Sequence, residues 1–160
     1  MAKLTHNQNQ FSQTPIIGML DRVKNPSVVP VRINPASEAV ITAGSAVKLV
    51  SGATPEILVD AVTGPTDGPV FGFIIFNTKK ALYSAGDNCE VAFDGSAIKL
   101  KAAAAIARGA EVACVAGTSS EDPLVQTAVT TNYVAGTALG QAAAAGELIT
   151  VLVKPTQTKI

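Results

Sequence analysis

The sequence has little of what most active sites are built from. Tryptophan is absent, and the 160 residues include five phenylalanines and two tyrosines. The single histidine, His6, stands near the start of the chain, whereas a metal site or a catalytic triad needs histidine beside further ligands or partners inside a fold. The GxSxG, HExxH, P-loop and GxGxxG motifs are also missing. These absences predict a protein that is not an enzyme and holds no cofactor or metal.

An excess of charge is missing as well. Twelve lysines and arginines balance twelve acidic residues, and the longest basic run is Lys79-Lys80. Proteins that bind a polyanion by releasing its counterions carry a basic excess, so nucleic acid and anionic membranes are not expected partners. No stretch reaches the roughly 18 uncharged apolar residues of a membrane-spanning helix, and the start lacks the apolar run of a signal peptide. We therefore expect synthesis in the cytoplasm.

The chain has only two cysteines, Cys89 and Cys114, and no CxxC motif. They are interpreted as small buried apolar residues in a reducing compartment. Their spacing does not decide whether they pair as a disulfide.

What the chain does have is alanine, valine, glycine and proline, which favour short strands joined by tight turns. Strand-like runs recur every 8–12 residues or so, a spacing typical of a barrel or sandwich. The sequence thus predicts an all-β domain over 31–160, with at most two short helical turns, at the Ala-rich stretches 102–107 and 141–145. The predicted strands are 28–33, 46–50, 56–62, 70–76, 89–93, 97–101, 111–115, 124–129, 133–139 and 148–153.

Asp94-Gly95 is a typical two-residue hairpin turn, in which both central residues adopt positive φ. It predicts antiparallel pairing of 89–93 with 96–100, which would place Glu90 opposite Lys99 as a favourable cross-strand charge pair.

A short pattern, a glycine turn that leads into a strand, recurs at 43–47, 85–91, 108–112 and 145–149. Echoes of this kind arise readily in β-proteins, so by themselves they do not establish a repeat.

Residues 1–30 differ from the rest, being rich in asparagine and glutamine and punctuated by proline. They are interpreted as an extended N-terminal arm that carries an apolar docking segment rather than a core element. The alternative is a disordered tail followed by one edge strand. The apolar residues of the arm are Phe11, Ile16, Ile17, Met19 and Leu20.

The most hydrophobic stretch, 70–76, is apolar on both faces, so both faces must be covered. Left as an exposed edge it would aggregate. It is either a central core strand or a strand with one face, formed by Phe71, Phe73 and Ile75, buried against a second subunit.

Several segments resemble the structural cement, or capsid decoration, proteins of tailed bacteriophages. They are GFIIFNTKK at 72–80 with YSAGD at 83–87, AAIARGAEV at 104–112, and GTALGQA at 136–142 with AGELI at 145–149. The resemblance covers about residues 40–154 and consists of turn-and-strand patterns.

The resemblance implies a small β-barrel or β-tulip domain present in many copies on the outer surface of a mature phage head. It implies the major capsid protein as partner, self-association as a homotrimer or less often a dimer, and a role in stabilising the shell. The competing interpretation is a receptor- or glycan-binding module on a virion fibre, which exposed aromatic residues on loops would favour.

Overall fold

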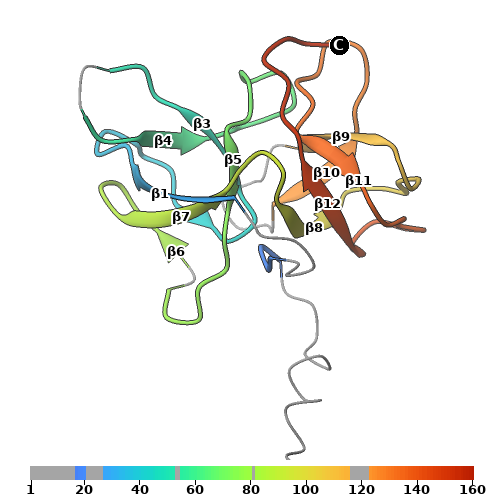
Figure 1. The fold of residues 1–160 in the computed structure, drawn as a ribbon, viewed down its shortest axis with the longest axis horizontal. Coiled ribbons are helices and arrows are strands. Elements are labelled where there is room, and N and C mark those ends of the chain that lie inside the picture. The colour runs from blue at the N-terminus through green and yellow to red at the C-terminus, as the bar shows by residue number, and fades with distance from the viewer. Residues whose placement is uncertain (1–16, 21–26, 53–54, 81, 116–122) are drawn as a thin grey trace, which may run out of the picture.

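The fold is built entirely from short strands (Figure 1). The computed structural model describes residues 17–20, 27–52, 55–80, 82–115 and 123–160. No helix occurs in these ranges, and accordingly none of them offers a helix that could cross a membrane. The all-β prediction is confirmed.

The described residues form twelve strands. They are β1 (Val28–Ile33), β2 (Ile41–Thr42), β3 (Ala46–Leu49), β4 (Leu58–Ala61), β5 (Gly72–Ile74), β6 (Leu82–Tyr83), β7 (Asn88–Ala92), β8 (Ala97–Ala102), β9 (Glu111–Val115), β10 (Leu124–Thr127), β11 (Gly136–Ala138) and β12 (Leu148–Val153).

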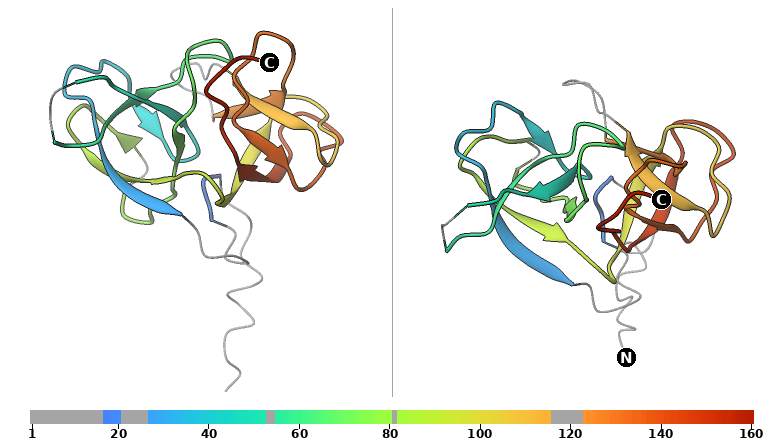
Figure 2. Two further views of the ribbon diagram at one scale, coloured as in Figure 1. Left: turned by 45° about the horizontal axis from the view of Figure 1, so that its top comes forward. Right: turned by 90° about the horizontal axis from the view of Figure 1, so that it is seen from above.

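Ten of these strands close into two five-stranded barrels. Barrel 1 has the strand order β1-β4-β3-β5-β7, and barrel 2 has the order β10-β8-β12-β11-β9. The remaining strands, β2 and β6, pair with each other as a two-stranded sheet. The region predicted as one barrel-like domain therefore holds two barrels, which lie side by side in all views (Figures 1 and 2).

The two barrels have the same topology. Leaving out β2 and β6, the first strand of each barrel pairs in parallel with the third, namely β1 with β4 and β8 with β10. The other four pairings, second with third, second with fourth, fourth with fifth and fifth with first, are antiparallel in both. Barrel 2 is thus a structural repeat of barrel 1.

The glycine turns seen in the sequence occupy equivalent places in the two repeats. Gly44 and Gly109 both have φ of +82°. The Gly44 N–H donates to the Ile74 carbonyl (2.8 Å), and the Gly109 N–H donates to the Ala138 carbonyl (2.7 Å). A left-handed backbone is accessible to glycine without steric penalty, so the recurring pattern in the sequence marks a recurring turn of the fold.

The predicted hairpin at Asp94-Gly95 is wrong. A turn does form there, since the Ser96 N–H donates to the Phe93 carbonyl (3.0 Å), but among these residues only Gly95 has a positive φ, +88°. A turn of this kind does not follow the twist of a two-stranded ribbon, so the flanking strands splay apart. Strand β7 pairs with β1 and β5, whereas β8 pairs with β10 and β12. The turn is the connection between the barrels.

The two Ala-rich stretches, 102–107 and 141–145, form no helical turns. Instead Ile106 and Ala142 exchange main-chain hydrogen bonds of 3.0 and 2.9 Å. A short segment cannot nucleate a helix by propensity alone, and pairing with each other supplies partners for its main-chain groups.

Two apolar cores hold the molecule together. The inner core of barrel 1 includes Ile74, which is fully buried. The second core, called the shared core here, fills barrel 2 and continues onto residues of barrel 1. Phe73, the neighbour of Ile74 in β5, belongs to the shared core and is 1% exposed. Successive side chains of a strand point to opposite faces, so β5 contributes to both cores. The barrel 1 members of the shared core are Ala46, Val62, Val70, Phe73, Ile75 and Ala92.

Gly72 and Gly136 are equivalent residues at the starts of β5 and β11, and each is crossed closely by a neighbouring strand. A Cβ atom would lie 2.3 Å from the Ala92 carbonyl oxygen at Gly72, and 2.2 Å from the Leu152 carbonyl oxygen at Gly136. Both positions therefore require glycine for the barrel to close.

We expect Gly72→Ala and Gly136→Ala each to lower the free energy of unfolding by about 2–4 kcal/mol, because backbone must move to admit the methyl group. Urea denaturation measures the change. Gly52→Ala is the control, since no atom lies within 4 Å of a Cβ there, and it should stay within about 0.5 kcal/mol of the parent. Equal stabilities for all three variants would contradict the close approach.

Candidate functional site

Reactive groups are scarce in the described part of the chain. No cluster of three or more histidine, cysteine, aspartate or glutamate residues there could hold a metal ion. Cys89 and Cys114 are free thiols, both buried. Burial raises the pKa of Cys89 to about 11 and that of Cys114 to about 12, so neither forms the thiolate that a nucleophile needs. His6 lies outside the described residues.

The feature that stands out is the junction of the two barrels, where residues 17–20, the anchor segment, are inserted. The Gly18 N–H donates to the Lys99 carbonyl of β8 (2.7 Å), and the Lys99 N–H donates back to the Met19 carbonyl (2.9 Å). The Phe76 N–H, just beyond β5, donates to the Gly18 carbonyl (3.0 Å). The anchor segment is therefore hydrogen-bonded to both barrels at once.

Gly18 makes this insertion possible. Its φ is +77°, and a Cβ atom would lie 2.8 Å from the Gly44 nitrogen and 3.0 Å from the Ile74 carbonyl oxygen. Two residues later, Leu20 forms an isolated bridge with Ile98 and packs against the shared core. The backbone of the anchor segment thus passes in direct contact with the backbone of barrel 1.

The structure places residues 17–20 in the folded body, where the sequence predicted an arm separate from the core. Ile17, Met19 and Leu20 are half-buried there. Phe11 and Ile16 lie outside the described residues. A capsid-binding role for these five residues remains a prediction.

The predicted oligomer interface lies largely inside the chain. Phe73 and Ile75 are 1% and 9% exposed and belong to the shared core. Phe71 is half-buried and stacks on Phe93, with ring centroids 6.0 Å apart. The second apolar face of this strand is thus covered by barrel 2 of the same chain, which leaves little of Phe73 and Ile75 for another subunit. A contact between copies through these residues remains a prediction.

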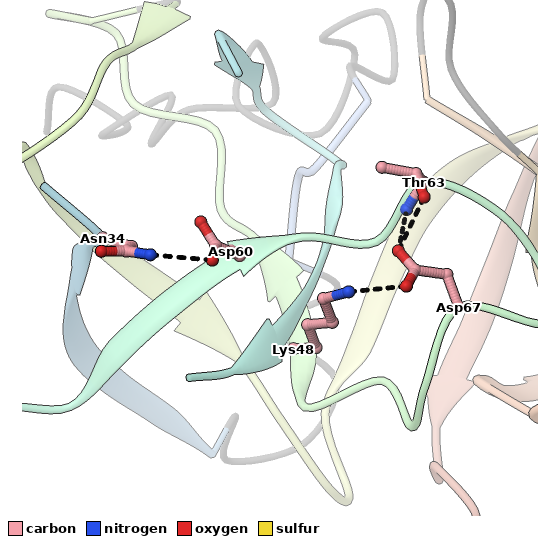
Figure 3. Close-up of polar contacts among 5 residues, drawn as sticks. All are labelled: Asn34, Lys48, Asp60, Thr63 and Asp67. Atoms are coloured by element: carbon pink, nitrogen blue, oxygen red, sulfur yellow. Dashed lines mark hydrogen bonds and ion pairs between the residues drawn. The ribbon is translucent and has the colours of Figure 1, made fainter. Parts of the chain in front are cut away.

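A polar cluster lies on barrel 1 (Figure 3). The Lys48 ammonium contacts one oxygen of Asp67 (2.6 Å), and the other oxygen accepts hydrogen bonds from the Thr63 N–H (2.8 Å) and hydroxyl (2.7 Å). Beside it the Asn34 amide donates to Asp60 (2.9 Å). Partial burial raises the pKa of Asp67, but the bonds from Lys48 and Thr63 outweigh it and leave that pKa below its usual value. The cluster holds the loop after β4 against β3.

The comparisons with known proteins find similarity to solved structures but not to family models or curated sequences. No family model matches the chain, and no curated protein sequence matches it. Among solved structures, the chain is similar to the head fiber gp8.5 N base of bacteriophage phi29, at 16% identity and a TM-score of 0.47, over 84% of this chain and 97% of that chain. Similarity at this level carries no information about what this chain binds.

Gly18→Ala should destabilise the protein more than Gly109→Ala. Both residues have positive φ, +77° and +82°, but at Gly109 a Cβ atom meets nothing within 4 Å. Gly109→Ala therefore carries only the backbone penalty of about 1–2 kcal/mol, whereas Gly18→Ala adds at least about 2 kcal/mol from overlap with backbone atoms. Urea denaturation of the two variants gives the difference. Equal losses would contradict the close approach of Gly18 to the backbone of barrel 1.

Asp67→Asn should destabilise the protein in a pH-dependent way. Because the folded-state pKa of Asp67 is lowered, its stabilising contribution is present above the unfolded-state pKa and is lost as pH falls through the folded-state pKa. We expect a loss of about 0.5–1 kcal/mol at pH 7 that shrinks below about pH 3. Urea midpoints at both pH values test this. Glu38→Gln, at an exposed position, is the control, and a pH-independent loss in Asp67→Asn would contradict the ion pair.

Proposed function

We propose that this chain is a non-enzymatic structural protein of a phage head, which binds the major capsid protein on the outer surface of the shell and stabilises it. Nucleic acid and membrane have no part in this function, and the protein is made in the host cytoplasm. The observation that carries the proposal is the junction of the barrels, where a shared apolar core and the main-chain hydrogen bonds of residues 17–20 join the two.

Rigidity is what a cementing protein needs, because it must hold neighbouring shell subunits at a constant separation. Domains joined by a small polar interface usually move relative to each other. Here one apolar cluster runs from barrel 1 into barrel 2, and Gly18 joins the two sides because its N–H donates to the Lys99 carbonyl and its carbonyl accepts from the Phe76 N–H. Two barrels locked in this way can transmit load between two contact regions.

The segments that resemble cement proteins also fall on the repeated framework. They contain β5 and β11, the equivalent fourth strands, and the turns at Gly109 and Gly146. Residues 72–76 and 136–140 thus occupy equivalent positions in the two barrels. The short sequence patterns that carry the resemblance therefore lie at strands and turns that recur in the two barrels.

A receptor- or glycan-binding module on a virion fibre has less support. Such sites present exposed aromatic side chains, whereas each of the described aromatic residues is buried or half-buried. Phe71 and Phe93 stack on each other, which covers one face of each ring. The described aromatic residues are Phe71, Phe73, Phe76, Tyr83, Phe93 and Tyr133.

Deleting residues 1–16 tests the proposal, because it spares the anchor segment on which the junction depends. We expect the truncated protein to keep its urea midpoint but to bind expanded capsids lacking decoration protein at least about tenfold more weakly. Burying Phe11 and Ile16 can contribute about 1.5–3 kcal/mol each, and tenfold corresponds to about 1.4 kcal/mol. Co-sedimentation measures the affinity and the number of copies bound. We propose that the protein binds as a homotrimer, with a dimer as the alternative.

The intact chain is the control. Equal binding by both proteins would show that residues 1–16 do not bind the capsid and that the barrels do. Failure of the intact chain to bind the capsids of its own phage would reject the cementing function.

A further inference from the structure

The two repeats differ at one equivalent place, where barrel 1 is covered and barrel 2 is open. Gly44 is buried, and a Cβ atom there would lie 2.2 Å from Ile17 of the anchor segment. Its equivalent, Gly109, is exposed and has nothing within 4 Å of a Cβ atom. The surface of barrel 1 that the anchor segment covers therefore has an equivalent on barrel 2 that is exposed.

The neighbouring positions show the same contrast. The Ile75 N–H donates to the Glu90 carbonyl (2.9 Å) and the Leu139 N–H donates to the Thr150 carbonyl (2.8 Å), so Ile75 and Leu139 are equivalent. Ile75 is 9% exposed, whereas Leu139 is 46% exposed. An exposed leucine stands where its counterpart is covered.

The next residue supplies the hydrogen-bond donor. Phe76 follows Ile75 and donates its N–H to the Gly18 carbonyl (3.0 Å). The residue at the same position in barrel 2 is Gly140, which follows Leu139. Gly109, Leu139 and Gly140 together are called the open slot.

The open slot is continuous with the surface that the anchor segment already uses. Met19 accepts a hydrogen bond from Lys99 of β8, Lys99 lies opposite Thr150 of β12, and Thr150 accepts a hydrogen bond from Leu139. The Lys99 ammonium also donates to the Thr150 hydroxyl. Lys99 and Thr150, on two neighbouring strands of barrel 2, thus connect the anchor segment to the open slot.

We propose that the open slot binds an extended apolar peptide with a central glycine, and that the shell protein supplies this peptide. The anchor segment shows the chemistry that fits: a glycine that lets two backbones touch, a carbonyl that accepts the N–H of residue 76 or 140, and flanking apolar side chains. That the shell protein is the source rests on the proposed function. A second copy is a poorer source, because its own anchor segment is held intramolecularly at high effective concentration.

Binding at the open slot is weaker than the docking of the anchor segment. Two of the three main-chain hydrogen bonds of the anchor segment are made with Lys99 of β8, and only the third, donated by the Phe76 N–H, has its counterpart in the open slot, at Gly140. A weak contact still adds useful affinity when the arm grips the shell at the same time.

The test uses the full-length protein, labelled with ¹⁵N, and a synthetic peptide with the sequence of residues 14–20. We expect saturable shifts of the Gly109, Leu139 and Gly140 amide signals. A peptide with valine in place of the glycine should bind at least about tenfold more weakly, since a β-branched residue prevents the close backbone approach. Absence of a saturable shift, or shifts confined to barrel 1, would overturn the proposal.

Two protein variants complete the test. Leu139→Asp should abolish the shifts, whereas Leu82→Asp, at a leucine of β6 that is 56% exposed, should leave them unchanged. Equal peptide binding by both variants would overturn the proposal that the peptide binds at the open slot.

The same variants applied to capsids separate this inference from the proposed function. If the parent binds capsids and Leu139→Asp binds them as well as Leu82→Asp does, the shell protein is not the occupant, although the cementing function stands. If the parent does not bind capsids, both the cementing function and the shell protein as the source of the peptide are rejected. The peptide titration then still decides whether the open slot binds a segment of this kind.

Discussion

Phe73 and Ile74 are adjacent residues of one short strand whose side chains fill two different cores. Ile74 completes the interior of barrel 1, and Phe73 is buried in the core that barrel 1 shares with barrel 2. Because a buried phenylalanine contributes about 1.5–3 kcal/mol, separating the barrels would expose it at a large cost. The joining of the two barrels, and with it the proposed role in stabilising a shell, depends on this two-sided burial.

Duplication of the barrel did not produce two identical surfaces. Lys48 and Asp60 face each other across β3 and β4, and the equivalent pair in barrel 2 is Ala113 and Gln126. Barrel 1 also carries the two-stranded sheet β2–β6, where barrel 2 has a single bridge at Ile106. The hydrogen-bonding framework is retained because it closes the barrel, whereas side chains outside it are free to differ.

The contacts that sequence reasoning missed are those made between distant segments. The sequence predicts that Asp94-Gly95 joins two paired strands. In the structure β7 pairs with β1 and β8 pairs with β12, so the two strands beside this turn do not pair with each other. The hydrogen bonds of Asp67 to Thr63 had a weak local signal, a threonine and an aspartate four residues apart in a Gly- and Pro-containing loop. The insertion of Gly18 had none, because its partners lie 26 to 81 positions further along the chain.

By itself the sequence determined that the protein is all-β, where most of its strands run, and which glycines turn the chain. These properties follow from local chemistry, since β-branched residues suit strands and glycine reaches positive φ. Tertiary structure alone decided that the strands close into two barrels, that Phe73 and Ile75 are covered within the chain, and that residues 17–20 join the body. Each of these depends on which distant backbone groups find partners, and a hydrogen-bonding pattern between distant segments leaves no periodicity in the sequence.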